Sequence, residues 1–117
     1  MLRLWRATIN TRNGLAFAIR SEQAIREELA ILAISVPLAW LIGVTTMRRV
    51  ELVATVVLVL VVELLNTAIE KLADRLTMDH DPQIGRVKDM GSAAVGVSLL
   101  MAGIFWLFAL VERMGVI

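Results

Sequence analysis

Three long runs without a charged residue limit what this chain can fold into. The runs cover residues 29–44, 52–62 and 93–111. A helix needs about 20 apolar residues to cross the ~30 Å hydrocarbon core of a bilayer, and helical patterning extends the first two runs toward that length. The sequence of 117 residues is also 58% hydrophobic, which is too apolar for a soluble domain of this size. We therefore predict one integral-membrane domain over residues 1–117, all-α in class.

The predicted membrane-spanning helices occupy residues of about 29–47, 52–76 and 90–111. Residues 1–28 combine Arg3 and Arg6 with Trp5 and other apolar side chains. This composition favours an amphipathic helix on an anionic membrane surface, although a frayed basic tail is the alternative. Within this segment Asn13-Gly14 predicts a turn, with a helix following it to residue 28.

Positive charge is distributed unequally between the two sides of this predicted topology. Nine of the twelve Lys and Arg residues fall in the N-terminal segment and between residues 71 and 88. The positive-inside rule makes this side cytoplasmic. The chain has no cysteine, so any metal would be held by oxygen ligands. It also has no glycine-rich phosphate loop, so phosphate binding would depend on side chains and helix ends.

A polar stripe lies on the second predicted span. Its members are Glu63, Asn66, Thr67, Glu70 and Asp74. At 100° per residue they fall within a sector of roughly 100° on one helix face. A carboxylate at this depth is costly if ionised, so Glu63 is either hydrogen-bonded to a neighbour such as Asn66 or acts as a base toward a hydroxyl at the interface.

The carboxylates of this region suit a hard cation. Glu63, Glu70 and the amide of Asn66 form an oxygen set of the kind that binds Mg²⁺ together with nucleotide phosphates. Ion pairing is the alternative for Glu70, and also for Glu22, which has Arg26 four residues later.

Two further polar groups precede the third span. Lys88-Asp89 supplies a cation able to hold a phosphate and a carboxylate able to orient it, although a lysine here can also be a topology anchor. His80 lies in a polar segment, residues 77–85, that is predicted to be a loop.

These motifs together resemble a known signature. The pattern is Glu63-x-x-Asn66-Thr67-Ala68-Ile69-Glu70, then Asp74, then Lys88-Asp89-Met90-Gly91-Ser92-Ala93-Ala94-Val95. It resembles the bacterial integral-membrane diacylglycerol kinases over most of the chain. The resemblance implies three spans, a surface helix, a homotrimer with active sites shared between subunits, and a place in the bacterial inner (cytoplasmic) membrane. It also implies transfer of the γ-phosphoryl group of MgATP to diacylglycerol, giving phosphatidic acid.

The resemblance also implies roles for individual residues. Glu63 would be the general base on the lipid hydroxyl, Glu22 and Glu70 would bind Mg²⁺, and Asn66 would keep the site polar. The residues implied to contact ATP are Lys88, Asp89, Arg3, Asp79, His80 and Asp81. Those implied to line the lipid site are Ser92, Arg49 and Trp106.

Two rival functions remain open at this point. Some members of the family phosphorylate undecaprenol instead, and the sequence of residues 89–95 favours diacylglycerol. A non-catalytic small membrane protein or transporter subunit is the alternative from another class, but it would not require Lys88-Asp89 at a fixed distance from Glu63 and Glu70. No nucleic acid partner is expected.

Overall fold

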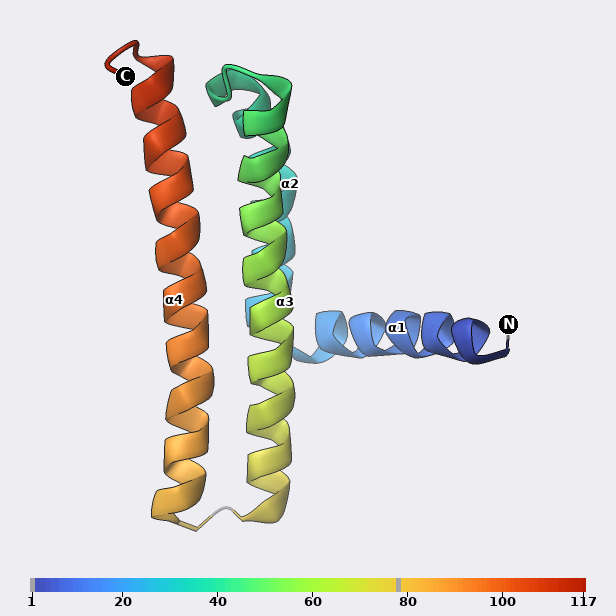
Figure 1. Cartoon of the computed structure of the whole chain (residues 1–117). Coiled ribbons are helices and arrows are strands. Elements are labelled where there is room, and N and C mark those ends of the chain that lie inside the picture. The colour runs from blue at the N-terminus through green and yellow to red at the C-terminus, as the bar shows by residue number, and fades with distance from the viewer. Residues whose placement is uncertain (1, 78) are drawn as a thin grey trace.

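The computed structural model describes residues 2–77 and 79–117, which form four helices (Figure 1). They are α1 (Leu2–Ser21), α2 (Gln23–Ile42), α3 (Thr46–Leu76) and α4 (Pro82–Arg113). No strand occurs among the described residues, so the predicted all-α class is confirmed. The molecule is elongated, with extents of 53 × 40 × 24 Å.

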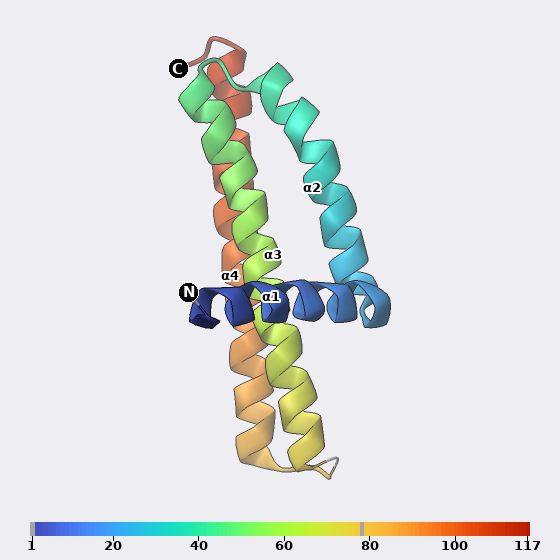
Figure 2. The ribbon, with the colours of Figure 1, turned by 90° about the vertical axis from the view of Figure 1, so that its right-hand side faces the viewer.

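Helices α2, α3 and α4 run alongside one another, whereas α1 extends crosswise from them (Figures 1 and 2). The α2–α3 connection and the C-terminus lie at one end, and the α3–α4 connection lies at the other. Helix α1 meets the other helices part-way along α3, so α3 and α4 both continue past its level (Figure 2).

The joint between α1 and α2 consists of one residue. Glu22 is extended, with φ −123° and ψ 115°. The guanidinium of Arg26 donates to the carbonyl oxygens of Ile19 at 2.8 Å and Arg20 at 3.2 Å, which satisfies the end of α1. The expected single helix up to residue 28 is therefore divided, with residues 23–28 belonging to α2.

The turn predicted at Asn13-Gly14 is wrong, because α1 continues through both residues. A glycine inside a helix costs only about 1 kcal/mol relative to alanine, which does not by itself end a helix. The adjacent turns are regular, since the hydroxyls of Thr8 and Thr11 donate to carbonyl oxygens four residues earlier.

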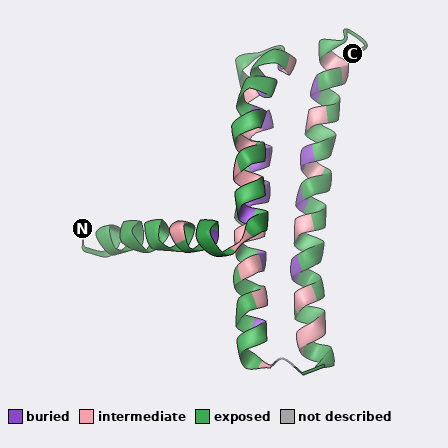
Figure 3. Cartoon of the chain, turned by 180° about the vertical axis from the view of Figure 1, so that it is seen from behind, coloured by how far each residue is buried: buried purple, intermediate pink, exposed green. Residues whose placement is uncertain are grey.

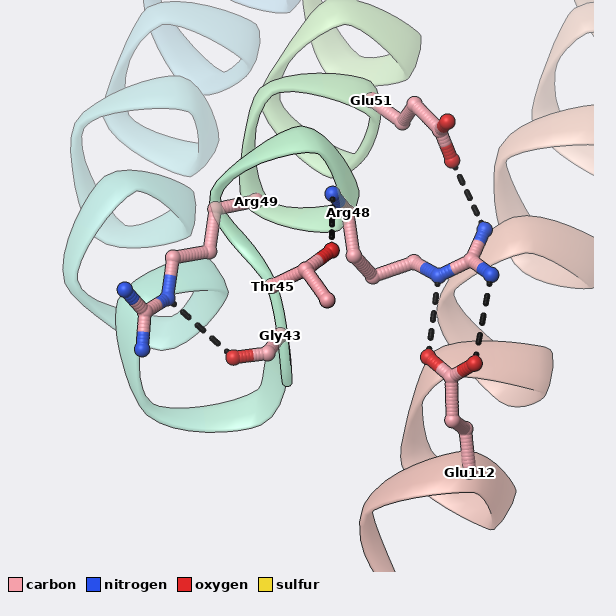
Figure 4. Close-up of polar contacts among 6 residues, drawn as sticks. All are labelled: Gly43, Thr45, Arg48, Arg49, Glu51 and Glu112. Carbon is pink, nitrogen blue, oxygen red and sulfur yellow. Dashed lines mark hydrogen bonds and ion pairs between the residues drawn. The ribbon is translucent and has the colours of Figure 1, made fainter. Parts of the chain in front are cut away.

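Arg48 and Arg49 both form hydrogen bonds at the connection between α2 and α3 (Figure 4). Helix α2 ends at Ile42, and the Thr45 hydroxyl accepts from the Arg48 backbone N–H at 3.1 Å to cap α3. Arg49 Nε donates to the Gly43 carbonyl oxygen at 3.1 Å. The predicted first span of 29–47 is therefore interrupted, because its last two residues belong to α3.

Arg48 also ties this joint to the end of α4. Its guanidinium donates to Glu112 at 3.0 Å and 3.3 Å and to Glu51 at 2.7 Å (Figure 4). It also lies 4.8 Å from the ring centroid of Phe108. A guanidinium suits this fork of two carboxylates and an aromatic face, so one residue joins α3 to α4 at this end.

The α3–α4 connection is shorter than the predicted loop of residues 77–85. Asp81 Oδ1 accepts from the backbone N–H groups of Gln83 at 2.9 Å and Ile84 at 3.3 Å, and Pro82 is the first residue of α4. Aspartate followed by proline is a helix-start signal, because proline needs no hydrogen bond in the first turn.

Two of the helices, α3 and α4, are long and apolar enough to cross a membrane. Only 33% and 11% of their most apolar windows are buried, whereas a core helix of a soluble protein would be mostly buried. Helix α2 does not qualify, because Arg26, Glu27 and Glu28 occupy its first two turns. Its uncharged part, residues 29–42, would rise only about 21 Å.

The buried positions lie on the facing sides of the helices (Figure 3), and many of them are alanine or serine. Ala39 of α2, Leu52 of α3 and Ala109 of α4 are fully buried in one cluster. Ala18 and Ile25 pack with Leu60 in a second cluster, which holds the α1–α2 joint against α3. Small residues allow this close approach, which is how helices pack in membranes.

Replacing Ala39 by leucine is expected to lower stability by about 1–3 kcal/mol, because the larger side chain overpacks a fully buried contact. The free energy of unfolding can be measured by denaturant titration in mixed micelles. Ala33→Leu on the exposed face of the same helix is the matched control and should have little effect. Equal effects of both substitutions would contradict the packing described above.

Candidate functional site

The site is the region where α1, the start of α2 and the middle of α3 meet. A groove of about 470 Å³ separates α1 from α3. It is lined by Leu64, Thr67, Ala68 and Lys71 of α3, by Glu22 at the joint, and by residues of α1. The polar stripe of α3 therefore lies at the level of α1.

Asn66 is the buried member of this stripe, with 8% of its surface exposed. Its Nδ2 donates to Glu70 Oε1 at 3.2 Å, and its Oδ1 has no hydrogen-bond partner. A Cβ placed on Gly91 of α4 would lie 2.2 Å from that Oδ1. A side chain at this position would force the amide to move, so the glycine of α4 allows Asn66 its present position.

Three half-buried carboxyl groups follow one another through the site. Glu63 is close enough to Glu70 for their charges to interact, and Glu28 of α2 interacts in the same way with Glu63. None of the three takes part in an ion pair within the described residues. Glu28 is not among the site residues predicted from the sequence, although a carboxylate directly before an uncharged run is a usable signal.

The oxygen donors of the site suit an Mg²⁺ ion that is held by few protein ligands. The described residues contain no group of three or more Asp, Glu or His side chains placed to hold a metal. Mg²⁺ usually takes only one or two protein carboxylates and completes its shell with water and phosphate oxygens. The Glu70 carboxylate, which takes part in no ion pair among the described residues, is a suitable donor of this type.

Glu22 is paired with a residue that the sequence analysis did not consider. Its Oε1 lies 2.7 Å from Nζ of Lys71, the residue after Glu70. The alternative of an ion pair with Arg26 is wrong, because that guanidinium caps α1. A pairing between the joint and α3 depends on tertiary structure, so helix periodicity gave no signal for it.

Lys88 of α4 is paired with Asp74 of α3, the last carboxylate of the stripe. The neighbouring Asp89 is exposed. Because Asp74 follows Glu70 by four residues, the Lys88 ammonium group lies about one turn beyond Glu70 toward the α3–α4 connection.

The outer predicted residues are spread along the molecule. Arg3 is exposed near the far end of α1, Ser92 is exposed on α4, and Asp79 and His80 are exposed in the α3–α4 connection. Asp81 has a capping role that uses one of its oxygens.

Arg49 and Trp106 lie toward the opposite end. Arg49 is bound to Gly43 and stacks on Trp40 at 5.0 Å, while Trp106 Nε1 donates to Leu52 O and Thr55 Oγ1, both at 3.2 Å. Within one chain, the structure brings together Glu63, Asn66 and Glu70, while Glu22 contacts α3 through Lys71. The outer groups lie apart from them.

Comparison with known proteins identifies the family. The profile of the family described as prokaryotic diacylglycerol kinase matches residues 10–110. The chain is 39% identical over 102 residues to the diacylglycerol kinase of Escherichia coli K12, covering 87% of this chain and 84% of that protein. It is 38% identical over 93 residues to that of Haemophilus influenzae, covering 80% and 79%. For that of Pseudomonas aeruginosa the identity is 36% over 104 residues, covering 89% and 85%.

The chain belongs to the prokaryotic diacylglycerol kinase family. The predicted resemblance to this family is therefore confirmed. Membership also agrees with the exposed apolar surfaces of α3 and α4, which indicate a membrane protein.

This family member has a second, mostly apolar groove of about 370 Å³ between α2, α3 and α4. Glu28 and Trp106 both line it, together with aliphatic residues of all three helices. Trp106, which was predicted to line the lipid site, thus shares an apolar surface with a carboxyl group that interacts with Glu63.

Gly91→Ala is expected to lower kinase activity about ten- to a hundredfold, because the added methyl group would displace the Asn66 amide and its bond to Glu70. Steady-state kinetics of the purified protein measures this. Gly96→Ala is the matched control on the same helix, since nothing lies within 4 Å of a Cβ there. Full activity of the Gly91 variant would show that the Asn66 position is unimportant.

Proposed function

We propose that this chain transfers the γ-phosphoryl group of MgATP to the hydroxyl of diacylglycerol, producing phosphatidic acid at the cytoplasmic face of a bacterial inner membrane. The relatives that carry the name diacylglycerol kinase cover most of this chain, which supports the substrate. The observation that carries the proposal is the series Glu63, Asn66 and Glu70 on α3, with Asn66 buried between Gly91 and Glu70.

Glu63 is the general base of the proposed reaction. The lipid hydroxyl gives its proton to the Glu63 carboxylate while its oxygen bonds to the γ-phosphorus, and the bond to the β-phosphate oxygen breaks to leave ADP. Glu63 lies on the same face of α3 as Asn66 and Glu70 and takes part in no ion pair among the described residues, so its carboxylate is available to accept the proton.

Glu70 and Glu22 are the proposed ligands of Mg²⁺. The metal would neutralise charge on the phosphate oxygens, as in other phosphoryl transfers. The Asn66 amide orients Glu70, and its free Oδ1 keeps a polar acceptor inside the site.

The nucleotide is proposed to bind along the part of α3 and α4 that extends past α1. Lys88 would exchange its contact with Asp74 for a phosphate oxygen, and Asp89 would bind on the same side. Arg3 and the exposed groups Asp79, His80 and Asp81 are proposed outer contacts to ATP.

The lipid is proposed to enter from the bilayer. The groove between α2, α3 and α4 offers an apolar surface for acyl chains and leads to Glu28. Trp106 lines it, and Ser92 and Arg49 are proposed to complete the lipid site.

We further propose that α2 is a third span and that the protein is a homotrimer with shared sites. The exposed small residues Ala93 and Ala94 line a shallow groove with Leu58 and Val62 of α3, which suits the close approach of a second copy. In a shared site, a neighbouring subunit would supply the groups that lie far from Glu63 and Glu70 within a single chain.

Glu63→Gln is expected to abolish phosphoryl transfer, since an amide cannot accept the proton, while the oligomer stays intact. Transfer is followed with radiolabelled ATP and mixed micelles of diacylglycerol, and assembly by size-exclusion chromatography with light scattering. Glu27→Gln removes an exposed carboxylate of α2 and should keep full activity. An active Glu63 variant would refute the base assignment.

Glu70→Gln is expected to raise the Mg²⁺ concentration needed for half-maximal activity by about tenfold or more, because a charged ligand is lost. Titration of activity with Mg²⁺ at fixed ATP measures this. An unchanged requirement would exclude Glu70 as a ligand.

Lipid specificity is tested by supplying diacylglycerol and undecaprenol separately with labelled ATP. Phosphorylation of diacylglycerol is expected. Transfer to undecaprenol alone would replace the proposed substrate, and no transfer to either lipid would favour a non-catalytic membrane protein.

A further inference from the structure

Lys71 lies on α3 directly after the proposed metal ligand Glu70, and its side chain leaves the stripe to face α1. Its Nζ is 2.7 Å from Oε1 of Glu22 and 5.3 Å from the ring centroid of Phe17 on α1. The side chains of Lys71 and Glu22 are 45% and 28% exposed. One ammonium group therefore contacts both the α1–α2 joint and α1 itself.

Among the described residues near the α1–α2 joint, Lys71 alone pairs with the Glu22 carboxylate. Glu22 precedes α2 but makes no side-chain capping hydrogen bond. Arg26 is occupied with the carbonyl groups of Ile19 and Arg20. In the described part of the chain, Lys71 is the cation within ion-pair distance of Glu22.

A bound ammonium group conflicts with metal binding at the same carboxylate. For Mg²⁺ to take Oε1, the ammonium group must leave, and for Mg²⁺ to take the second oxygen, two cations must lie side by side. Either case weakens metal binding. The ring of Phe17, 5.3 Å from Nζ, is a second partner with which the ammonium group can stay in contact when it leaves the carboxylate.

We propose that Lys71 is a built-in counter-cation of Glu22 that competes with the divalent metal and so sets the metal concentration at which the site fills. This inference rests on the proposed function, because it takes Glu22 as a metal ligand. Lys71 is a positioning residue here, since it acts through the carboxylate and takes no part in the transfer.

The test measures metal binding directly in the full-length protein. Mn²⁺ is titrated into the protein in detergent micelles with a non-hydrolysable ATP analogue, and free Mn²⁺ is followed by electron paramagnetic resonance. Lys71→Met keeps an unbranched side chain but removes the charge. It is expected to lower the Mn²⁺ dissociation constant about two- to fivefold, as removal of an exposed ion pair allows. Lys71→Arg should restore the original value. An unchanged or higher constant in the methionine variant overturns the proposal.

Two controls separate this effect from other causes. Arg75→Met removes the same charge from an exposed position one turn later on α3 and should leave the constant unchanged. An equal gain there would mean that general charge is responsible and would overturn the proposal. In a Glu22→Gln background, Lys71→Met should have no effect, because the competition acts through Glu22.

The Glu22→Gln variant also separates the role of Lys71 from the role of Glu22 as a metal ligand. Weaker Mn²⁺ binding in that variant, without the gain in Lys71→Met, would overturn the role of Lys71 alone. Unaltered Mn²⁺ binding in Glu22→Gln would remove Glu22 from the metal site and overturn both.

Discussion

The contact of Asn66 with Gly91 fixes how closely α3 and α4 approach each other at the site. Both residues are buried, and the space beside the glycine holds the amide oxygen. The amide nitrogen is thereby directed toward Glu70 one turn later, and Asp74 continues the same face to reach Lys88 on α4. The absence of one side chain on α4 thus organises two turns of polar groups on α3.

The carboxylates of the site differ in how their charges are balanced. Glu22 and Asp74 each have a lysine, whereas Glu28, Glu63 and Glu70 have no ion-pair partner in the described residues. Neighbouring carboxylates without cations oppose folding, and such an arrangement is typical of functional sites. The carboxylates without a cation include the proposed base Glu63 and the proposed metal ligand Glu70, whereas the second proposed ligand, Glu22, has a lysine as partner.

Local signals in the sequence predicted the helices and the polar face, because both follow from periodicity along one element. The hydrogen bond between Asn66 and Glu70 needs only this spacing. The ion pair of Lys71 was not predictable in this way, since it depends on how the α1–α2 joint packs on α3. The break at Glu22 likewise depends on a side chain four residues later. The start of α4 was predictable from Asp81-Pro82, but the whole segment was assigned to a loop.

The crosswise position of α1 has a consequence for how the proposed enzyme sits in a bilayer (Figure 2). In the proposed arrangement α1 lies in the headgroup layer, level with residues 64–71 of α3, which line the groove between the two helices. The depth of the carboxylates in the bilayer is then determined by the position of α1 at the membrane surface and not by the total length of the spans. A thicker or thinner bilayer would strain the opposite end, where Arg48 joins α3 to α4, while the reacting groups stay level with the lipid headgroups.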